Sequence, residues 1–184
     1  MKKEGHEKKR TLHNGLSLFG IRNPGLHGFC LCLYARTGVL YENEKENGVS
    51  HFTEHIVFRN INHIFGGKLY ELLDEKGITF TAATYKEFMQ FSVTGTTAAF
   101  SFAADLIAAL FEPLSDALSK EAFESERGRI RAEIRECDEK GTLEYVVKKE
   151  AWGKTPLSRM ITGTLGSVSK ITLKKCEEER KCLL

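Results

Sequence analysis

The hydrophobic and polar positions of the chain follow two periods, which predicts a mixture of strands and helices. The nearly continuous apolar run over residues 29–36 is typical of a central strand. β-Branched and aromatic residues are concentrated over residues 78–84 and 88–96, which predicts two further strands joined by a polar turn. An Asn-Gly turn signal within residues 12–16 predicts a hairpin near the start of the chain.

Helical periods with their end signals predict four helices in the same chain. Ser50 is expected to cap the first helix, and Gly77 is expected to end the second. The predicted helices cover residues 50 to about 62, 68–76, 98–112 and about 120 to 140. Strands followed and interrupted by helices in this way predict an α+β fold.

Composition narrows the class of protein. The 184 residues are 41% hydrophobic, which sets aside disordered and collagen-like classes and favours one domain with its own core. With 27 Lys and Arg against 25 Asp and Glu the formal net charge is +2, so neither nucleic acid nor an anionic membrane is an expected partner. The longest apolar run, residues 98–111, contains Asp105 and is too short to span a bilayer.

Five cysteines are present, and no two of them form a C-x-x-C motif. Cys30 and Cys32 lie two apart in a predicted strand, so both are expected on one face of it. We interpret the cysteines as thiols in a reducing cytosol, with a metal or redox role for them as the alternative. The charged N-terminal segment has no apolar stretch of the signal-peptide kind behind it, so a cytoplasmic location is expected.

Candidate chemistry is concentrated in the segment His51-Phe52-Thr53-Glu54-His55. On a helix, His51 and His55 lie one turn apart on the same face and can present two imidazole nitrogens to one metal ion. Glu54 is offset from that line by one residue and can reach a water at the ion without being a ligand. Because zinc acidifies a water towards neutrality, a carboxylate beside it can act as general base. This is the inverse of the H-E-x-x-H arrangement.

A third ligand is predicted on the long charged helix. Two glutamates, Glu126 and Glu133, are seven apart and share a helical stripe with apolar residues. Carboxylates directed at a core are costly unless a cation or hydrogen bonds meet them. One of them is therefore predicted to complete a His-His-Glu site, with the other behind it. The alternative is that these glutamates pair with Arg127 or Arg129. The stripe consists of Phe123, Glu126, Ile130, Glu133 and Cys137.

These motifs resemble the pitrilysin/insulinase family of inverted zinc peptidases, which includes insulin-degrading enzymes and mitochondrial processing peptidases. The resemblance rests on H-x-x-E-H followed after 78 residues by Glu133 within Glu126-Arg127…Glu133-Ile134. Further matches in the same order lie at residues 12–16, 48–50, 55–58, 77–91 and 156–164. The resemblance implies a mainly antiparallel sheet with helices packed on one side, as in a single metalloprotease domain of that family.

The resemblance also implies roles for individual residues. His51, His55 and Glu133 would be the Zn²⁺ ligands, Glu54 the general base and Glu126 a supporting catalytic glutamate. An extended peptide would bind along an edge strand by strand addition. The residues of that strand are Thr79, Phe80, Thr81, Ala82 and Ala83, with threonine at 81 where the family has asparagine.

We therefore predict a zinc metallopeptidase acting on small or unfolded polypeptides. Residues 11–173 are expected to form its domain, between a polar N-terminal tail over 1–10 and a charged C-terminal tail over 174–184, for which the start of a helix is the alternative. The family's working unit has two halves of two such domains each, so a second subunit is expected to supply the missing half. The alternative is a non-catalytic zinc-containing module that binds peptides or a partner chain.

Overall fold

The computed structural model describes residues 7–114, 118–137 and 141–182. Its strands form two antiparallel sheets. β1 (Glu7–Thr11) pairs with β2 (Ser17–Ile21) around the predicted Asn-Gly turn. The second sheet has the order β3-β5-β4, made of β3 (Gly28–Ala35), β5 (Met89–Thr96) and β4 (Thr79–Thr84). The antiparallel pairing and the predicted strands are confirmed.

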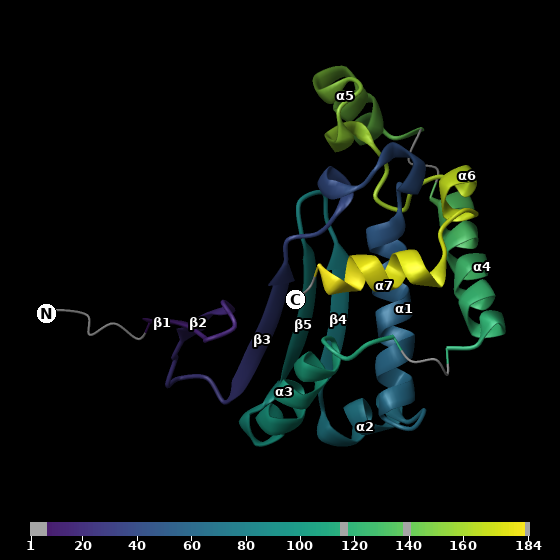
Figure 1. Ribbon diagram of the computed structural model, residues 1–184. Coiled ribbons are helices and arrows are strands. Elements are labelled where there is room, and N and C mark those ends of the chain that lie inside the picture. The colour runs from purple at the N-terminus through teal and green to yellow at the C-terminus, as the bar shows by residue number, and fades with distance from the viewer. Residues whose placement is uncertain (1–6, 115–117, 138–140, 183–184) are drawn as a thin grey trace, which may run out of the picture.

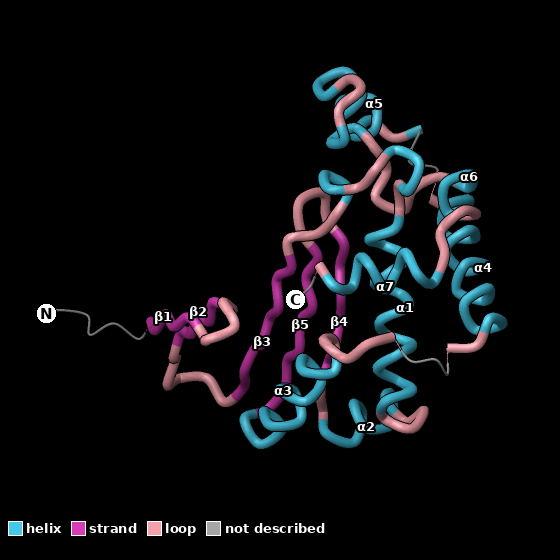
Figure 2. The backbone as a smooth tube through the Cα atoms, in the orientation of Figure 1, coloured by secondary structure: helices cyan, strands magenta, loops and turns pink. Residues whose placement is uncertain are grey.

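Helices cover one face of the three-stranded sheet, as predicted (Figure 1). Figure 2 shows the same arrangement by element type, with the β1–β2 hairpin standing apart from the helical side. None of the described helices combines the length and the apolar character needed to cross a bilayer. The helices are α1 (Val49–Ile64), α2 (Leu69–Lys76), α3 (Phe100–Ala109), α4 (Lys120–Glu136), α5 (Leu143–Trp152), α6 (Leu165–Val168) and α7 (Leu173–Lys181).

Helix α1 is the central element because it is buried on two sides. Val57 and Ile61 pack into the core formed with the sheet, α2 and α3. Phe52 and Ile56 belong to a second buried cluster formed with α4 and the C-terminal helices. The Phe52 ring stacks on Phe123 of α4, with ring centroids 4.9 Å apart. Residues on α1 are thus held between the sheet and α4.

The start of α1 differs from the prediction that Ser50 caps it. The cap position is Gly48, whose φ of 95° favours glycine, and the carboxylate of Glu42 accepts hydrogen bonds from the backbone N–H groups of Gly48 and Ser50, both at 2.9 Å. A Cβ at Gly48 would lie 2.6 Å from the Thr162 carbonyl oxygen. The Ser50 hydroxyl instead donates to Glu179 of α7 at 3.0 Å.

The two predicted tails contain regular structure where the structure describes them, and the C-terminal one follows the helical alternative. Residues 173–181 form α7, which lies across α1 (Figure 1), with Cys176 and Arg180 buried. Arg180 donates to the Phe111 carbonyl at 2.9 Å and pairs with Glu177, so its charge is neutralised within the fold. Residues 7–10 belong to β1, while 1–6 and 183–184 lie outside the described residues. A high content of charged residues therefore does not identify a tail, because a mostly charged helix can still pack through a few buried positions.

The structure also differs from the predicted helices at two places, the end of α4 and the presence of α5. The long charged helix ends at Glu136, and residues 138–140 of the predicted span lie outside the described residues. Helix α5 was not predicted, although Thr142 caps it by accepting a hydrogen bond from the Tyr145 backbone N–H. The other predicted helices are present, with ends shifted by at most three residues.

Candidate metal centre

The three predicted ligands come together between α1 and α4. His51 and His55 lie one turn apart on α1, with ring centroids separated by 4.8 Å. Glu133 of α4 reaches both: its Oε1 is 3.5 Å from His51 Nε2, and its Oε2 is 3.8 Å from His55 Nε2. One donor atom from each residue lies within 4.8 Å of the other two. Two imidazoles and a carboxylate at this separation can share one ion.

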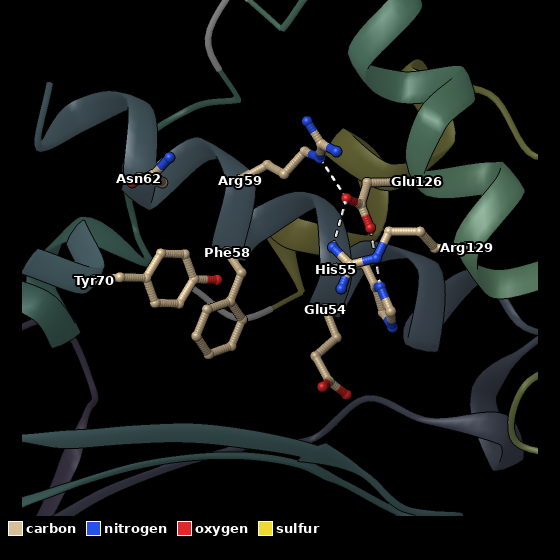
Figure 3. Close-up of a pocket in the computed structure, with 8 residues that line it drawn as sticks. All are labelled: Glu54, His55, Phe58, Arg59, Asn62, Tyr70, Glu126 and Arg129. Carbon is tan, nitrogen blue, oxygen red and sulfur yellow. Dashed lines mark hydrogen bonds and ion pairs between the residues drawn. The ribbon is translucent and has the colours of Figure 1, made fainter. Parts of the chain in front are cut away.

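Glu126 lies behind His55, two helical turns before Glu133 on the same stripe of α4. Its Oε2 is 3.1 Å from His55 Nδ1, which leaves His55 Nε2 directed at Glu133. This contact fixes the orientation of the imidazole, as carboxylates beside metal-ligating histidines do. In Figure 3 the Glu126 carboxylate stands between His55 and two arginines. Glu126 thus contacts His55 at the ring nitrogen that faces away from Glu133, and Glu133 is the carboxylate that reaches both imidazoles.

The Glu126 side chain is almost fully buried, and three side chains hold it there. Arg59 Nε donates to Oε1, and Arg129 Nη1 donates to the same oxygen at 3.1 Å. Burial raises the pKa of Glu126, but the contacts with His55, Arg59 and Arg129 outweigh it and lower that pKa to about 2. The alternative that the α4 glutamates pair with Arg127 or Arg129 thus holds in part, since Arg129 contacts Glu126. Arg127 instead pairs with Glu124 at 2.9 Å.

His51 is held in the form that binds metals. Burial, with a smaller effect of His55, lowers its pKa to about 4, so its imidazole is neutral near pH 7. Its buried Nδ1 has no hydrogen-bond partner among the described residues, while its Nε2 faces Glu133. Two imidazoles with one carboxylate form a donor set that suits zinc. The residues present therefore fit a metal ion.

Glu54 points towards the sheet and away from Glu126 (Figure 3). The Thr84 hydroxyl, at the end of β4, donates to Glu54 Oε2 at 2.5 Å. Burial raises the pKa of Glu54, and this hydrogen bond partly offsets the rise. A carboxylate with a raised pKa, beside two potential ligands, is suited to accept and return a proton near neutral pH.

Two residues that support the site were not predicted. Thr84, which contacts Glu54, belongs to the matched segment around Thr81 but received no role. Arg59, which contacts Glu126, lies one helical turn after His55, so the same spacing that selected the histidines could have found it. Neither contact follows from local sequence, because each joins two elements that are distant in the chain.

A pocket of about 340 Å³ opens beside these groups. Figure 3 shows its aromatic wall, Phe58 and Tyr70, next to Glu54 and His55. The predicted peptide-binding strand, β4, lies at an edge of the three-stranded sheet, with Thr79 and Thr81 exposed and Phe80 buried in the core. The pocket is lined by Glu54, His55, Phe58, Arg59, Asn62, Tyr70, Glu126 and Arg129.

Comparison with known proteins identifies the family. The family described as Insulinase (Peptidase family M16) matches residues 22–165. The chain belongs to this family. The predicted resemblance is thereby confirmed, and the chain is related to zinc proteases at the level of the M16 family.

Two relatives show how much of an M16 protein the chain represents. It is 27% identical to the mitochondrial-processing peptidase subunit beta of Mus musculus, over 89% of this chain and 33% of that protein. It is 23% identical to an uncharacterized zinc protease of Bacillus subtilis, over 85% of this chain and 38% of that protein. The chain therefore spans well under half the length of these M16 relatives.

A solved structure supports the fold independently. An inactive domain of an M16 peptidase from Pseudomonas fluorescens matches with a TM-score of 0.81 at 16% identity, over 95% of this chain and 42% of that one. The predicted α+β metalloprotease-type fold is thus confirmed. Because that domain is described as inactive, the fold does not by itself establish activity, and the residues at the site decide the question.

Proposed function

We propose that this chain is a zinc-dependent peptidase domain that hydrolyses peptide bonds in small or unfolded polypeptides. The observation that supports the proposal is the convergence of His51, His55 and Glu133 between α1 and α4. Membership of the M16 family supports peptide as the substrate class. Glu54, on the same helix and facing the sheet, supplies the carboxylate that such a reaction needs.

The proposed roles follow from the chemistry of each side chain. A zinc ion held by His51, His55 and Glu133 would supply a Lewis acid that polarises the scissile carbonyl and acidifies a water. Glu54 accepts the proton of the attacking water and returns it to the leaving amine. Thr84 donates to Glu54 Oε2 and so fixes the rotamer of the base. Glu126 orients His55 from behind through the 3.1 Å contact with Nδ1.

Replacement of Glu54 by glutamine tests the proposal. Zinc-loaded protein is assayed on an unfolded polypeptide, and Glu54→Gln is expected to lower kcat by about 100- to 10,000-fold because the general base is lost. The matched control is Glu136→Gln on the exposed face of α4, which should retain activity and zinc. Equal turnover by the wild type and Glu54→Gln would contradict the proposal, as would the absence of turnover in both across a range of protein concentrations and with a candidate partner chain added.

We propose that the substrate backbone adds to the free edge of β4 beside Thr79–Ala83. An edge strand presents unpaired N–H and C=O groups to an extended peptide. Substrate peptides with one N-methylated amide, moved residue by residue, test this without changing the protein. KM is expected to rise at alternate substrate positions, because alternate amides of a strand face its neighbour. A uniform effect at every position would contradict strand addition.

The chain spans about a third of the mouse relative, so we propose that a second subunit completes the working unit. In the assay above, activity per chain that rises with protein concentration would indicate that a second copy supplies the missing half. Activity independent of concentration would show that the chain works as a monomer.

The second candidate function is a zinc-containing module that binds peptides without cutting them. It is favoured by the inactive M16 domain that shares this fold. Under this alternative, wild type and Glu54→Gln would bind the same peptide with equal affinity, and neither would release products. The Glu54 assay therefore separates the two functions.

A further inference from the structure

Two thiols lie together on the face of the sheet opposite the helices. In β3, Leu31 and Leu33 face the core, while Cys30 and Cys32 alternate with them and face the other way. Cys30 is exposed and Cys32 is partly exposed. Because α1 packs on the core face, this thiol pair is separate from the His51 centre.

The two sulfur atoms are in contact and share a neighbour. Cys30 Sγ lies 3.4 Å from Cys32 Sγ. Ser92, opposite Cys32 in the β3–β5 register, places its Oγ 3.7 Å from Cys30 Sγ and 3.5 Å from Cys32 Sγ. Gln90 Nε2 also lies 3.8 Å from Cys32 Sγ. Two sulfurs and a hydroxyl thus converge on one point above the sheet.

The strand geometry favours an ion between the sulfurs over a bond between them. Residues two apart in a strand have Cα atoms about 6.6–6.8 Å apart, whereas disulfides are commonest at about 5.5–6 Å. A direct bond would therefore lie at the long end of the Cα spacings that disulfides adopt. Two sulfurs on one tetrahedral zinc ion, with zinc–sulfur bonds of about 2.3 Å, lie about 3.8 Å apart, and the larger Cd²⁺ holds them slightly further apart. Side-chain rotations are enough to reach that spacing from 3.4 Å.

We propose that Cys30 and Cys32, with Ser92 beside them, bind a single thiophilic metal ion of the Cd²⁺ or Cu⁺ class. Soft thiolate ligands select such ions. Binding releases the thiol protons to solvent and forms two metal–sulfur bonds. Burial raises the pKa of Cys32, but its hydrogen bonds with Ser92, Cys30 and Gln90 outweigh this and lower that pKa, whereas the contact with Cys32 raises the pKa of Cys30. Only the first of these two shifts favours a thiolate, so the proposal rests on the position of the two sulfurs. The site is independent of the proposed peptidase function.

Titration with Cd²⁺ tests the proposal, with zinc added first to occupy the His51 centre. Thiolate-to-cadmium charge transfer gives an ultraviolet band that histidine and carboxylate ligands do not give. The wild type is expected to show this band saturating at one equivalent. Cys30→Ser and Cys32→Ser should each lose it, because a single thiolate leaves a weak site.

Cys182→Ser is the matched control, since Cys182 is also exposed but follows α7 and is not part of β3. It should keep the full band, and circular dichroism of Cys30→Ser should match that of the wild type. The proposal would be overturned by a band of equal size in either strand variant, or by its loss in the control. A Cys30–Cys32 disulfide in protein purified without reductant, seen as a loss of two hydrogens in the mass and no Cd²⁺ binding, would overturn it as well.

Discussion

The α1–α4 helix pair and the β1–β2 hairpin differ in how far their side chains are buried and in how many contacts those side chains make. In the helix pair, Phe52 is completely buried and stacks on Phe123, and three side chains hold the buried carboxylate of Glu126. In the hairpin every residue of both strands is exposed, including Phe19 at 63%. A two-stranded ribbon without a packed face has little stability of its own.

The difference shows which part of this fold holds its side chains in fixed rotamers. Metal ligands need side chains whose rotamers are fixed by packing and by further hydrogen bonds. The helix pair meets that requirement through contacts from several elements, whereas the hairpin depends on its backbone ladder. A substitution should therefore have large consequences in the first region and small ones in the second, and this expectation can be tested at single residues.

The largest effect is expected on the zinc content of the protein when Glu133 of α4 is replaced, compared with replacement of the nearby Glu136. Glu133→Ala should lower the metal content from about one zinc per chain to nearly none after dialysis, since two histidines alone hold the ion weakly. Glu136→Ala, on the exposed face of the same helix, should leave it unchanged. Elemental analysis of both variants is the measurement. Equal zinc in the two variants would contradict the assignment of Glu133 as a ligand.

The next effect compares the same substitution in the two regions. Phe52→Ala should lower the free energy of unfolding by about 3–5 kcal/mol, because it opens a cavity between α1 and α4. Phe19→Ala in β2 should change it by less than about 0.5 kcal/mol. Urea unfolding followed by circular dichroism measures both. Similar losses would show that another surface covers the hairpin.

The smallest effect is expected at Glu126, which is proposed to orient His55 without binding the ion. Glu126→Gln keeps the shape but removes the charge that holds His55 Nδ1, so zinc affinity should fall by about 10- to 100-fold. A competition titration with a chelator measures the change. A loss as complete as that of Glu133→Ala would instead place Glu126 among the direct ligands.

The local pattern of hydrophobic and polar residues was enough to predict the strands and the helix near the site. The strands at residues 78–84 and 88–96 and the helix that bears His51 follow from side-chain periodicity, which depends only on neighbours in the chain. For residues 174–184 the charged sequence left a tail and the start of a helix as alternatives. Helix α7 forms there because Cys176 packs in the cluster with α1 and Arg180 donates to the Phe111 carbonyl after α3. The cap of α1 by Glu42 was missed because it spans a loop.

The sequence by itself determined that His51, Glu54 and His55 share a helix and that Glu126 and Glu133 share a stripe, because both follow from the helical repeat. From the residues alone, either glutamate could have completed the site. Only the tertiary structure decided that Glu133 faces both imidazoles, that Glu126 stands behind His55 and that Thr84 meets Glu54. These contacts depend on the relative position of α1, α4 and β4, which the packing of the two cores sets as a whole.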